Sequence, residues 1–273
     1  MLYIQLTLAL LCAVVTHIIL GWYTSWIFIP VFFGMLVAWF LVWHLVWWII
    51  IIILTLLVDK KKEVTHISPF YRWAFVQSMQ IALLYTNVKV HIEGKEKIPK
   101  DQRFLVVANH LSNYDPISIL YALRKHTIVF ISKPENFNIP FAGPIMHKAG
   151  FMPIDRDHVK NAIVTINKAA DYIKRGETSV FIFPEGTRNR TEKPLLEFKN
   201  GAFKIATKAG CPLVIIAISG TEKVKKRIPL RSHVYLKVVD VIPAEKVKEM
   251  RTGDLSDYAY EQILNNITHG KEK

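Results

Sequence analysis

Residues 104–116 read Phe-Leu-Val-Val-Ala-Asn-His-Leu-Ser-Asn-Tyr-Asp-Pro, and this stretch decides the fold class. It begins with a continuous apolar run, Phe104 to Ala108, which is typical of a strand covered on both faces. A polar segment follows, and Pro116 then favours the start of a helix. A buried strand, a polar loop and a helix in this order indicate an α/β unit with its polar residues at the carboxyl end of the strand.

The same alternation of strands and helices continues on both sides of this stretch. Strands are expected at 88–92, 104–108, 127–131, 151–154, 179–183, 213–218 and 234–239, the last as an edge strand because its apolar pattern is weaker. Helices are expected at 66–86, from 116 onward, and at 139–149, 159–175 and 201–209. The sequence therefore predicts an α/β fold with a mostly parallel sheet flanked by helices.

The first 58 residues differ from the rest because they carry no charged side chain. All 35 Lys and Arg and all 22 Asp and Glu residues lie farther along, where they give a net charge of +13. About 20 apolar residues cross a bilayer as a helix, and Leu2 to Leu20 and Val31 to Val58 supply two such lengths. The sequence thus predicts that a two-helix transmembrane hairpin precedes the α/β fold. Three aromatic side chains of the turn between the spans would lie at the interface: Trp22, Tyr23 and Trp26.

Basic residues 60–62 follow the second span at once, which by the positive-inside rule favours the cytoplasmic side. The expected organisation is a membrane anchor at 1–58, a basic juxtamembrane linker and helix at 59–87, and a catalytic domain at 88–273 on the cytoplasmic side of the cell membrane. A re-entrant or interfacial hairpin is the alternative for the anchor. A cleaved signal peptide is disfavoured because no basic residue lies near the N-terminus. Two cysteines cannot build a secreted disulfide scaffold.

Three polar clusters directly follow predicted strands. Residues 109–115 follow the strand quoted first, Asp155 and Arg156 follow the strand at 151–154, and residues 184–188 follow the strand at 179–183. In open α/β sheets, ligands bind outside the carboxyl ends of the strands. The three clusters are therefore predicted to form one site.

His110 and Asp115 are the candidates for proton transfer. Five residues along a helix would leave their side chains about 140° apart, so they meet only if the chain turns at Ser112 and Asn113. If they meet, the carboxylate fixes one ring nitrogen and leaves the other free to remove a proton. The alternative is structural: Asp115 caps the helix that begins at Pro116, and His110 belongs to an ordinary loop.

The other two clusters have the composition of a phosphate site. Arg156 and Arg188 can bind phosphate through paired hydrogen bonds. Gly186 allows the backbone to approach a ligand, and Glu185 and Thr187 add polar groups. The alternative is that both arginines pair with neighbouring carboxylates on a solvated rim.

Together these residues resemble the four ordered sequence blocks of the glycerolipid acyltransferase family, most closely the 1-acylglycerol-3-phosphate acyltransferases. The blocks are Asn109-His110 with Asp115, residues 150–156, residues 183–188, and Pro212-Leu213-Val214. The resemblance covers about Lys89 to Gly220. One departure is Ile215, which stands where the fourth block often has a second proline. Because that block is thought to shape the acyl pocket, the change bears on chain-length preference.

The resemblance implies a glycerol-3-phosphate acyltransferase-like fold and an acyl transfer to the sn-2 hydroxyl of 1-acyl-sn-glycerol 3-phosphate, making phosphatidic acid. His110 would act as the general base, Asp115 would orient it, and backbone N–H groups near the pair would stabilise the oxyanion. Neither a covalent acyl-enzyme, nor a metal, nor a cofactor is required.

The same resemblance implies the groups that hold the substrates. The glycerol phosphate would be held by Arg156, Glu185, Gly186, Thr187 and Arg188, with Lys133 as an additional phosphate contact. The acyl donor would be acyl-CoA or acyl carrier protein (acyl-ACP), and membrane lipids would supply the acceptor.

Other functions remain open on the sequence alone. The acceptor could be another lysophospholipid or lysolipid. A metal-dependent hydrolase using His110, Asp115 and Glu185 would be possible on residue types alone, and so would a non-catalytic lipid-binding protein. Nucleic acid is disfavoured as a partner because the basic residues are scattered and the chain is tethered to a membrane.

Overall fold

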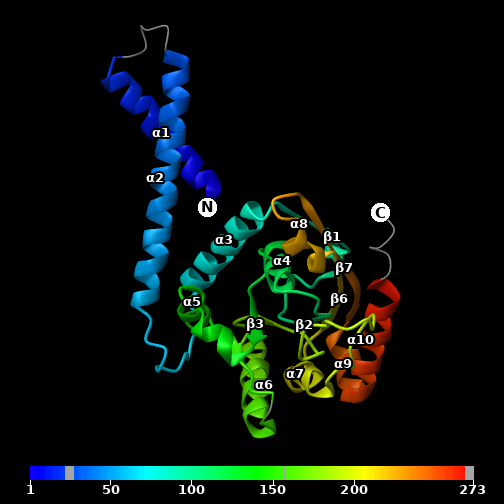
Figure 1. The fold of residues 1–273 in the computed structure, drawn as a ribbon. Helices are drawn as coiled ribbons and strands as arrows, with labels where there is room; N and C mark the ends of the chain where they lie inside the picture. The colour runs from blue at the N-terminus through cyan, green and yellow to red at the C-terminus, as the bar shows by residue number, and fades with distance from the viewer. Residues whose placement is uncertain (22–27, 157, 268–273) are drawn as a thin grey trace. The chain divides into compact units, whose positions relative to one another are not determined.

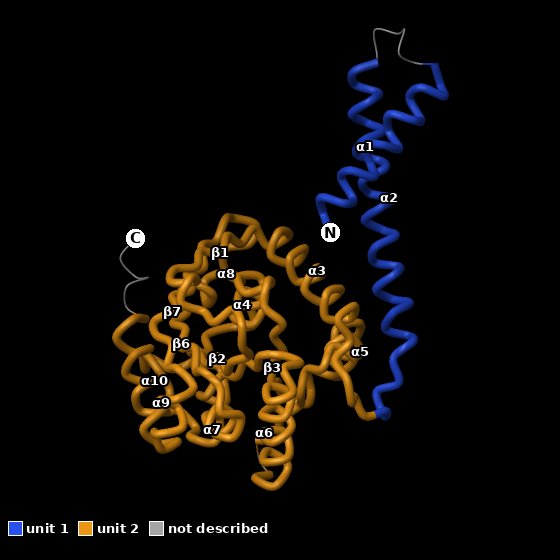
Figure 2. Tube along the Cα trace, turned by 180° about the vertical axis from the view of Figure 1, so that it is seen from behind, with its two compact units in different colours: residues 1–62 blue, residues 63–273 orange. Residues whose placement is uncertain are grey.

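The computed structural model describes residues 1–21, 28–156 and 158–267, and the chain forms two compact units (Figures 1 and 2). The first unit spans Met1–Lys62 and the second spans Glu63–Lys273. The second unit contains the sheet and all three polar clusters.

The first unit is a pair of apolar helices, α1 (Leu2–Ile19) and α2 (Phe28–Leu56). Both are long and apolar enough to cross a bilayer, as judged by length and composition. Polar side chains link them: Gln5 donates to the Trp43 carbonyl at 3.3 Å, and Trp39 donates to the Thr16 hydroxyl at 3.2 Å. The two helices of the predicted hairpin are thus present. The turn expected to carry Trp22, Tyr23 and Trp26 lies outside the described residues.

The second unit alternates strands and helices in the expected order. Its strands are β1 (Val88–Glu93), β2 (Leu105–Ala108), β3 (Ile128–Ser132), β4 (Met152–Pro153), β5 (Ser179–Ile182), β6 (Leu213–Ser219) and β7 (Ser232–Ile242). Its α-helices are α3 (Pro69–Tyr85), α4 (Tyr114–Ala122), α5 (Ala142–Lys148), α6 (Val159–Lys174), α7 (Lys204–Ala209), α8 (Thr221–Arg227), α9 (Ala244–Glu249) and α10 (Thr252–Ile267).

The strands form one sheet in the order β1-β7-β6-β2-β5-β3-β4. Every neighbouring pair is parallel except β6 and β7. In the centre, Leu105 of β2 lies opposite Val180 of β5 and Leu213 of β6. All three are buried, as continuous apolar strands require. The predicted mostly parallel α/β sheet is confirmed.

The prediction that residues 234–239 form an edge strand is wrong. β7 is paired on both sides, parallel to β1 and antiparallel to β6. Its pattern alternates because one face is open: Val234 and Leu236 are buried, whereas His233 and Tyr235 are exposed. An alternating apolar pattern indicates that one face of the strand is solvated. It does not indicate that a neighbouring strand is missing.

Helices cover both faces of the central sheet (Figure 1). On one face, α6, α7 and α10 pack with β2, β5 and β6 in a single core around Phe203 and Tyr172. On the other, aromatic rings stack outward from the sheet, with Phe130 of β3 against Phe151 and Phe151 against Phe75 of α3. The expected cover on both faces is therefore present, and α3 belongs to it.

Three helices beyond β6 were not expected from the sequence. α8 and α9 have only seven and six residues, too short for a clear helical period. α10 is longer and amphipathic, and it buries Leu255, Ala259 and Ile263 at a spacing of four residues. This helix completes the core on the α6 and α7 side.

Gly220, the link from β6 to α8, is a position that the fold restricts to glycine. Its φ is +88°, and a Cβ there would lie 2.4 Å from the His233 carbonyl oxygen. Gly176 has a similar φ of +67°, but a Cβ added there would meet no atom within 4 Å. Comparing the two separates backbone strain from a steric clash.

We expect Gly176→Ala to cost about 1 kcal/mol of unfolding free energy through its positive φ alone. Gly220→Ala should cost clearly more, about 3 kcal/mol or above, because β7 must also shift. Thermal unfolding of the two purified variants in the same detergent measures the difference. Equal losses at both positions would contradict the close packing of Gly220 on β7.

Candidate active site

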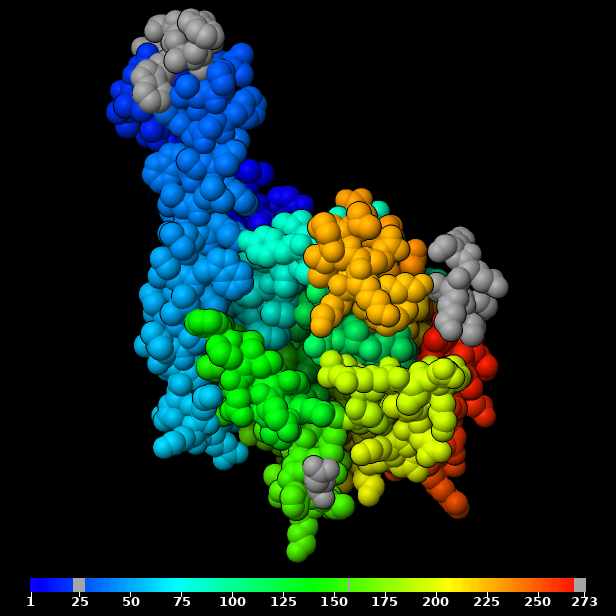
Figure 3. Space-filling model, viewed as in Figure 1, coloured from blue at the N-terminus to red at the C-terminus, as the bar shows by residue number. Residues whose placement is uncertain are grey.

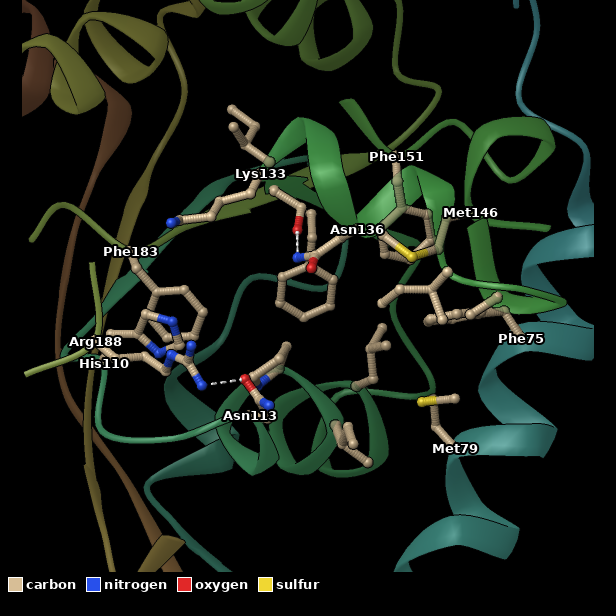
Figure 4. Close-up of a pocket in the computed structure, with 18 of the residues that line it drawn as sticks. Phe75, Met79, His110, Asn113, Lys133, Asn136, Met146, Phe151, Phe183 and Arg188 are labelled. Carbon is tan, nitrogen blue, oxygen red and sulfur yellow. Dashed lines mark hydrogen bonds between the residues drawn. The ribbon is translucent and has the colours of Figure 1, made fainter. Parts of the chain in front are cut away.

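The three polar clusters converge on one cavity of about 340 Å³ at the carboxyl ends of the central strands. The face shown in Figure 3 is hollowed between the green segment of α5 and the yellow segment after β5. Figure 4 shows the interior, with His110, Asn113, Phe183 and Arg188 at one side and apolar side chains at the other. The single site expected from the strand ends is therefore formed.

His110 and Asp115 are in direct contact at the polar side. Nδ1 of His110 lies 2.7 Å from Oδ2 of Asp115, because the chain turns between them before α4 begins. A carboxylate oxygen accepts hydrogen bonds, so in the neutral imidazole Nδ1 donates this bond and Nε2 keeps its lone pair. The His110 side chain is 15% exposed and lines the cavity, whereas Asp115 is fully buried.

Asp115 is held by more donors than a helix cap would need. Its Oδ2 also accepts from the backbone N–H groups of Leu111, at 2.6 Å, and Ser112, at 2.7 Å. Its Oδ1 accepts from the hydroxyl of Thr221, the first residue of α8. The carboxylate also lies in the first turn of α4, where a negative charge is favoured.

The alternative of Asp115 as the cap of a helix starting at Pro116 is wrong in detail. α4 begins at Tyr114 and its N-cap is Asn113, whose side chain makes no capping bond. Asp115 instead ties together the His110 loop and the start of α8.

Neighbouring groups fix the His110 ring and its backbone. The ring stacks on Phe183, with centroids 3.9 Å apart and planes inclined by 12°. The preceding residue, Asn109, is fully buried and bonds both backbone groups of Ile218 in β6, at 2.9 and 2.7 Å. The loop that carries His110 is therefore fastened to the sheet.

Glu185 faces the protein backbone and does not line the cavity. Its carboxylate accepts from the His110 N–H at 2.5 Å and from the Leu196 N–H at 3.2 Å. Burial raises the pKa of this carboxyl to about 7, although the two hydrogen bonds act in the opposite direction. Glu185 thus links the backbone of the His110 loop to the backbone at Leu196.

Gly186 also lies outside the cavity lining, and its φ of +73° turns the chain. A Cβ at this position would come within 3.0 Å of the Lys199 side chain. The turn directs the next two residues, Thr187 and Arg188, into the cavity. Glycine is required here for the path of the chain.

Four of the expected phosphate contacts do line the cavity: Lys133, Arg156, Thr187 and Arg188. They come from three separate segments, after β3, after β4 and after β5. Arg188 donates to the Asn113 side chain at 2.8 Å, which holds its guanidinium beside His110 (Figure 4). Three cations in the lining of a small cavity give it the charge that a phosphate monoester requires.

The opposite end of the cavity is apolar. Helices α3, α4 and α5, strand β3 and the segments that flank α5 line it, through Phe75, Met79, Leu120, Phe130, Ile139, Ala142, Met146 and Phe151. Figure 4 shows Phe75, Met79, Met146 and Phe151 grouped on the side away from His110. Ile215, expected from the fourth block to bear on the acyl pocket, is instead fully buried in the core on the α6 and α7 side and is absent from the lining.

Several site residues were not anticipated from the sequence. Thr221 follows β6 at its carboxyl end, so the rule that located the other clusters applies to it as well. Phe75 and Met79 lie on α3 and carry no chemical signature, so only tertiary structure reveals them. Backbone N–H groups near the pair were expected to stabilise the oxyanion, and those of residues 110–112 are engaged by Glu185 or Asp115.

The site residues do not converge as metal ligands. In the described parts of the chain, no group of three or more His, Cys, Asp and Glu side chains is placed to hold a metal ion. Glu185 bonds the His110 and Leu196 N–H groups and does not line the cavity that His110 lines.

Comparisons with known proteins agree with this arrangement. Residues 89–219 match the sequence profile of the acyltransferase family. The chain is 30% identical over 187 residues to a 1-acyl-sn-glycerol-3-phosphate acyltransferase of Haemophilus influenzae, covering 67% of this chain and 77% of the relative. It is 28% identical over 192 residues to the protein of the same name from Borreliella burgdorferi, covering 69% and 76%.

A solved structure is also similar. The crystal structure of the 1-acyl-sn-glycerophosphate acyltransferase PlsC from Thermotoga maritima matches with a TM-score of 0.60 and 27% identity. The match covers 74% of this chain and 82% of that protein. The matched profile begins and ends within a residue of the span expected from the sequence blocks.

Glu185 makes a specific pH dependence of stability testable. Its pKa is raised from 4.5 to about 7 in the folded protein, so the folded state binds this proton more tightly than the unfolded state does. The contribution is fully present below about pH 4.5 and is lost as the pH rises through about 7. Because a tenfold change in proton affinity corresponds to about 1.36 kcal/mol, the loss is at most about 3 kcal/mol.

We expect Glu185→Gln to remove this dependence, since glutamine keeps the size and one acceptor but does not titrate. Between pH 5 and 8, the melting temperature of the wild type should fall relative to that of the variant by about 5 °C. Circular dichroism melts across this range provide the measurement. Parallel pH profiles for the two proteins would show that Glu185 is ionised throughout.

Proposed function

Because the chain belongs to the glycerolipid acyltransferase family, we propose that it transfers a fatty acyl group from an acyl thioester to the sn-2 hydroxyl of 1-acyl-sn-glycerol 3-phosphate. The product is phosphatidic acid. The observation that carries this proposal is the 2.7 Å contact between His110 and Asp115 at the junction of a cationic and an apolar end of one cavity.

In this proposal His110 is the general base. Nδ1 donates to Asp115, so Nε2 accepts the proton of the acceptor hydroxyl as its oxygen attacks the thioester carbonyl carbon. A new C–O bond forms and the carbonyl becomes a tetrahedral oxyanion. When the intermediate collapses, the C–S bond breaks and the thiolate takes the proton back from the imidazolium. No covalent acyl-enzyme and no cofactor are needed.

Asp115 stabilises the positive charge that His110 carries between these two steps. A buried carboxylate next to an imidazolium interacts more strongly than an exposed one, because the low local dielectric screens the pair less. The donors from Leu111, Ser112 and Thr221 fix the carboxylate in place. Phe183 holds the ring in the plane that suits this bond.

The cationic end is assigned to the phosphate of the acceptor. Arg156, Arg188 and Lys133 supply charge, and Thr187 supplies a hydroxyl donor. Binding the phosphate holds the glycerol hydroxyl at a fixed distance from His110. The bimolecular step then becomes effectively unimolecular. Glu185 and Gly186 contribute by shaping the loop that presents Thr187 and Arg188.

The apolar end is assigned to the acyl chain of the donor. Each buried methylene contributes about 0.8 kcal/mol, so an apolar cavity of limited depth selects chain length. The donor itself is acyl-CoA or acyl-ACP, both of which present a thioester and carry negative charge. The net charge of +13 favours either one.

The two apolar helices are assigned as the membrane anchor. Lysophospholipid and diacyl product both reside in the bilayer, so tethering raises their local concentration at the site. The basic residues 60–62 that follow α2 support a cytoplasmic location of the second unit. A membrane surface is therefore the expected working environment of the enzyme.

We expect His110→Ala to lower the rate of acyl transfer at least about 100-fold, because it removes the general base. Asp115→Asn should lower the rate by a similar or greater factor. The asparagine amide is neutral, so it no longer stabilises the positive charge on the His110 ring. The assay combines purified protein, 1-acyl-sn-glycerol 3-phosphate in vesicles, and acyl-CoA or acyl-ACP in separate reactions.

A matched control exists on the surface of the same unit. His158 and Asp155 form a similar pair, with Nδ1 and Oδ2 2.8 Å apart, but the His158 side chain is 73% exposed. His158→Ala should retain activity within about twofold. Full transfer by His110→Ala would overturn the mechanism, and preferred transfer to lysophosphatidylglycerol in competition would reassign the acceptor.

A second prediction concerns acyl chain length. Met79→Trp should fill part of the apolar end and shift the donor preference toward shorter chains, with about a fourfold loss in kcat/KM for each methylene excluded. Met79→Leu has nearly the volume of the wild type and is the control. The measurement is kcat/KM for thioesters of 8 to 18 carbons. A change in acceptor chain preference alone would contradict the assignment.

A further inference from the structure

A basic projection follows the site at the end of β6. Residues 222–231 carry five basic side chains and one acidic one, all exposed: Lys223, Lys225, Lys226, Arg227, Arg231 and Glu222. Within the described part of the chain, no carboxylate lies within 4.0 Å of any of the five cations as an ion pair. Among the described residues, the five cations of this projection are therefore without a carboxylate ion-pair partner.

Apolar side chains lie among these charges. Ile228 is 45% and Leu230 is 66% exposed, in the loop between α8 and β7. Leu84 and Tyr85, at the end of α3, are 57% and 58% exposed. We call Leu84, Tyr85 and residues 222–231 together the α8 corner.

Hydrogen bonds hold the α8 corner in a fixed conformation. Asn87, two residues after α3, donates to the Pro229 carbonyl at 3.2 Å and accepts from Arg231 at 3.3 Å. Its carbonyl also accepts from the Ser232 N–H at 3.0 Å, where β7 begins. Figures 1 and 2 both show the end of α3 beside α8. The apolar and basic side chains are thus held on one edge.

This edge lies one short helix from the candidate active site. α8 begins at Thr221, whose hydroxyl donates to Asp115, and buries Val224 completely. The orientation of α8 is therefore fixed relative to the His110–Asp115 pair. A surface that binds the α8 corner is brought to the same end of the sheet as the cavity.

We propose that the α8 corner docks onto an anionic lipid surface, with Ile228 and Leu230 entering the interface and the surrounding cations contacting lipid phosphates. Exposed apolar side chains flanked by lysine and arginine are the composition of interfacial membrane contacts. Lysine and arginine stems also extend along apolar groups while their charged ends reach headgroups. The contact adds to the anchor and orients the cavity toward the bilayer.

An acidic protein is the rival occupant, and carrier protein is the relevant case. The observations favour lipid because the exposed Leu230, Ile228 and Leu84 would stay in water against a purely acidic partner face. The docking proposal rests on the proposed function only in its kinetic readout, and the physical readout below is independent of acyl transfer.

The experiment uses the full chain in lipid nanodiscs with an environment-sensitive fluorophore at position 230. Leu230→Cys is introduced on a Cys12→Ser background. Cys211 does not compete for the label, since it is 4% exposed and burial raises its pKa to about 12. The discs contain phosphatidylcholine alone or with phosphatidylglycerol, and spin-labelled lipid quenches any probe that reaches the interface.

The control label is at Lys174→Cys. Lys174 ends α6 just before β5, so it lies near the amino ends of the parallel strands. α8 follows β6 and therefore lies at their carboxyl ends. Lys225→Glu with Lys226→Glu tests the charge. Lys174→Glu with Lys246→Glu makes the same change in net charge at exposed positions elsewhere.

We expect the probe at 230 to be quenched at least twice as strongly as the probe at 174, and more with phosphatidylglycerol than without it. The α8 double variant should lose that increment, and its KM for the lipid acceptor should rise about fivefold in anionic vesicles with kcat within twofold. The matched double variant should do neither.

Equal quenching at 230 and 174 in anionic discs would overturn the proposal. So would a loss confined to acyl-ACP kinetics in neutral micelles, which would assign the α8 corner to carrier protein. If acyl transfer itself is absent from wild type while the quenching pattern holds, the proposed function fails and the docking surface stands.

Discussion

A single buried carboxylate organises the candidate active site of this protein. Asp115 accepts from the His110 ring, from two backbone N–H groups of its own loop, and from Thr221 at the start of α8. A buried charge without such donors would be strongly destabilising, so the surrounding chain must adopt the conformation that provides them. The position of the imidazole, the start of α4 and the start of α8 all follow from this requirement.

The fold was largely predictable from the sequence because its strands are continuously apolar. Leu105, Val180 and Leu213 lie in runs that only a sheet covered on both faces accommodates. The same reasoning failed for β7, since alternating burial reports a solvated face and cannot distinguish an edge from an interior strand. The short helices α8 and α9 were missed because one or two turns contain too few residues to display a period.

The site was predictable in part, for a related reason. Polar residues at strand ends identified His110, Asp115, Arg156 and Arg188 as neighbours before any distance was known. Side-chain direction was not predictable: Glu185 lies in the same cluster, yet its carboxylate bonds backbone N–H groups behind the loop. The apolar half of the cavity depends on α3, which is far from the motifs in sequence and comes close only through packing.

The side chain of Asn109 limits the mobility of the loop that carries His110. It hydrogen-bonds both backbone groups of Ile218 and so extends the hydrogen bonding between β2 and β6 by one residue. His110 is the next residue along the chain. The loop that carries His110 is thus tied to the central strands, and local opening of this loop has to break these two buried hydrogen bonds. An opening of the cavity would then involve the apolar wall that side chains of α3 and α5 line, such as Phe75, Met79 and Met146.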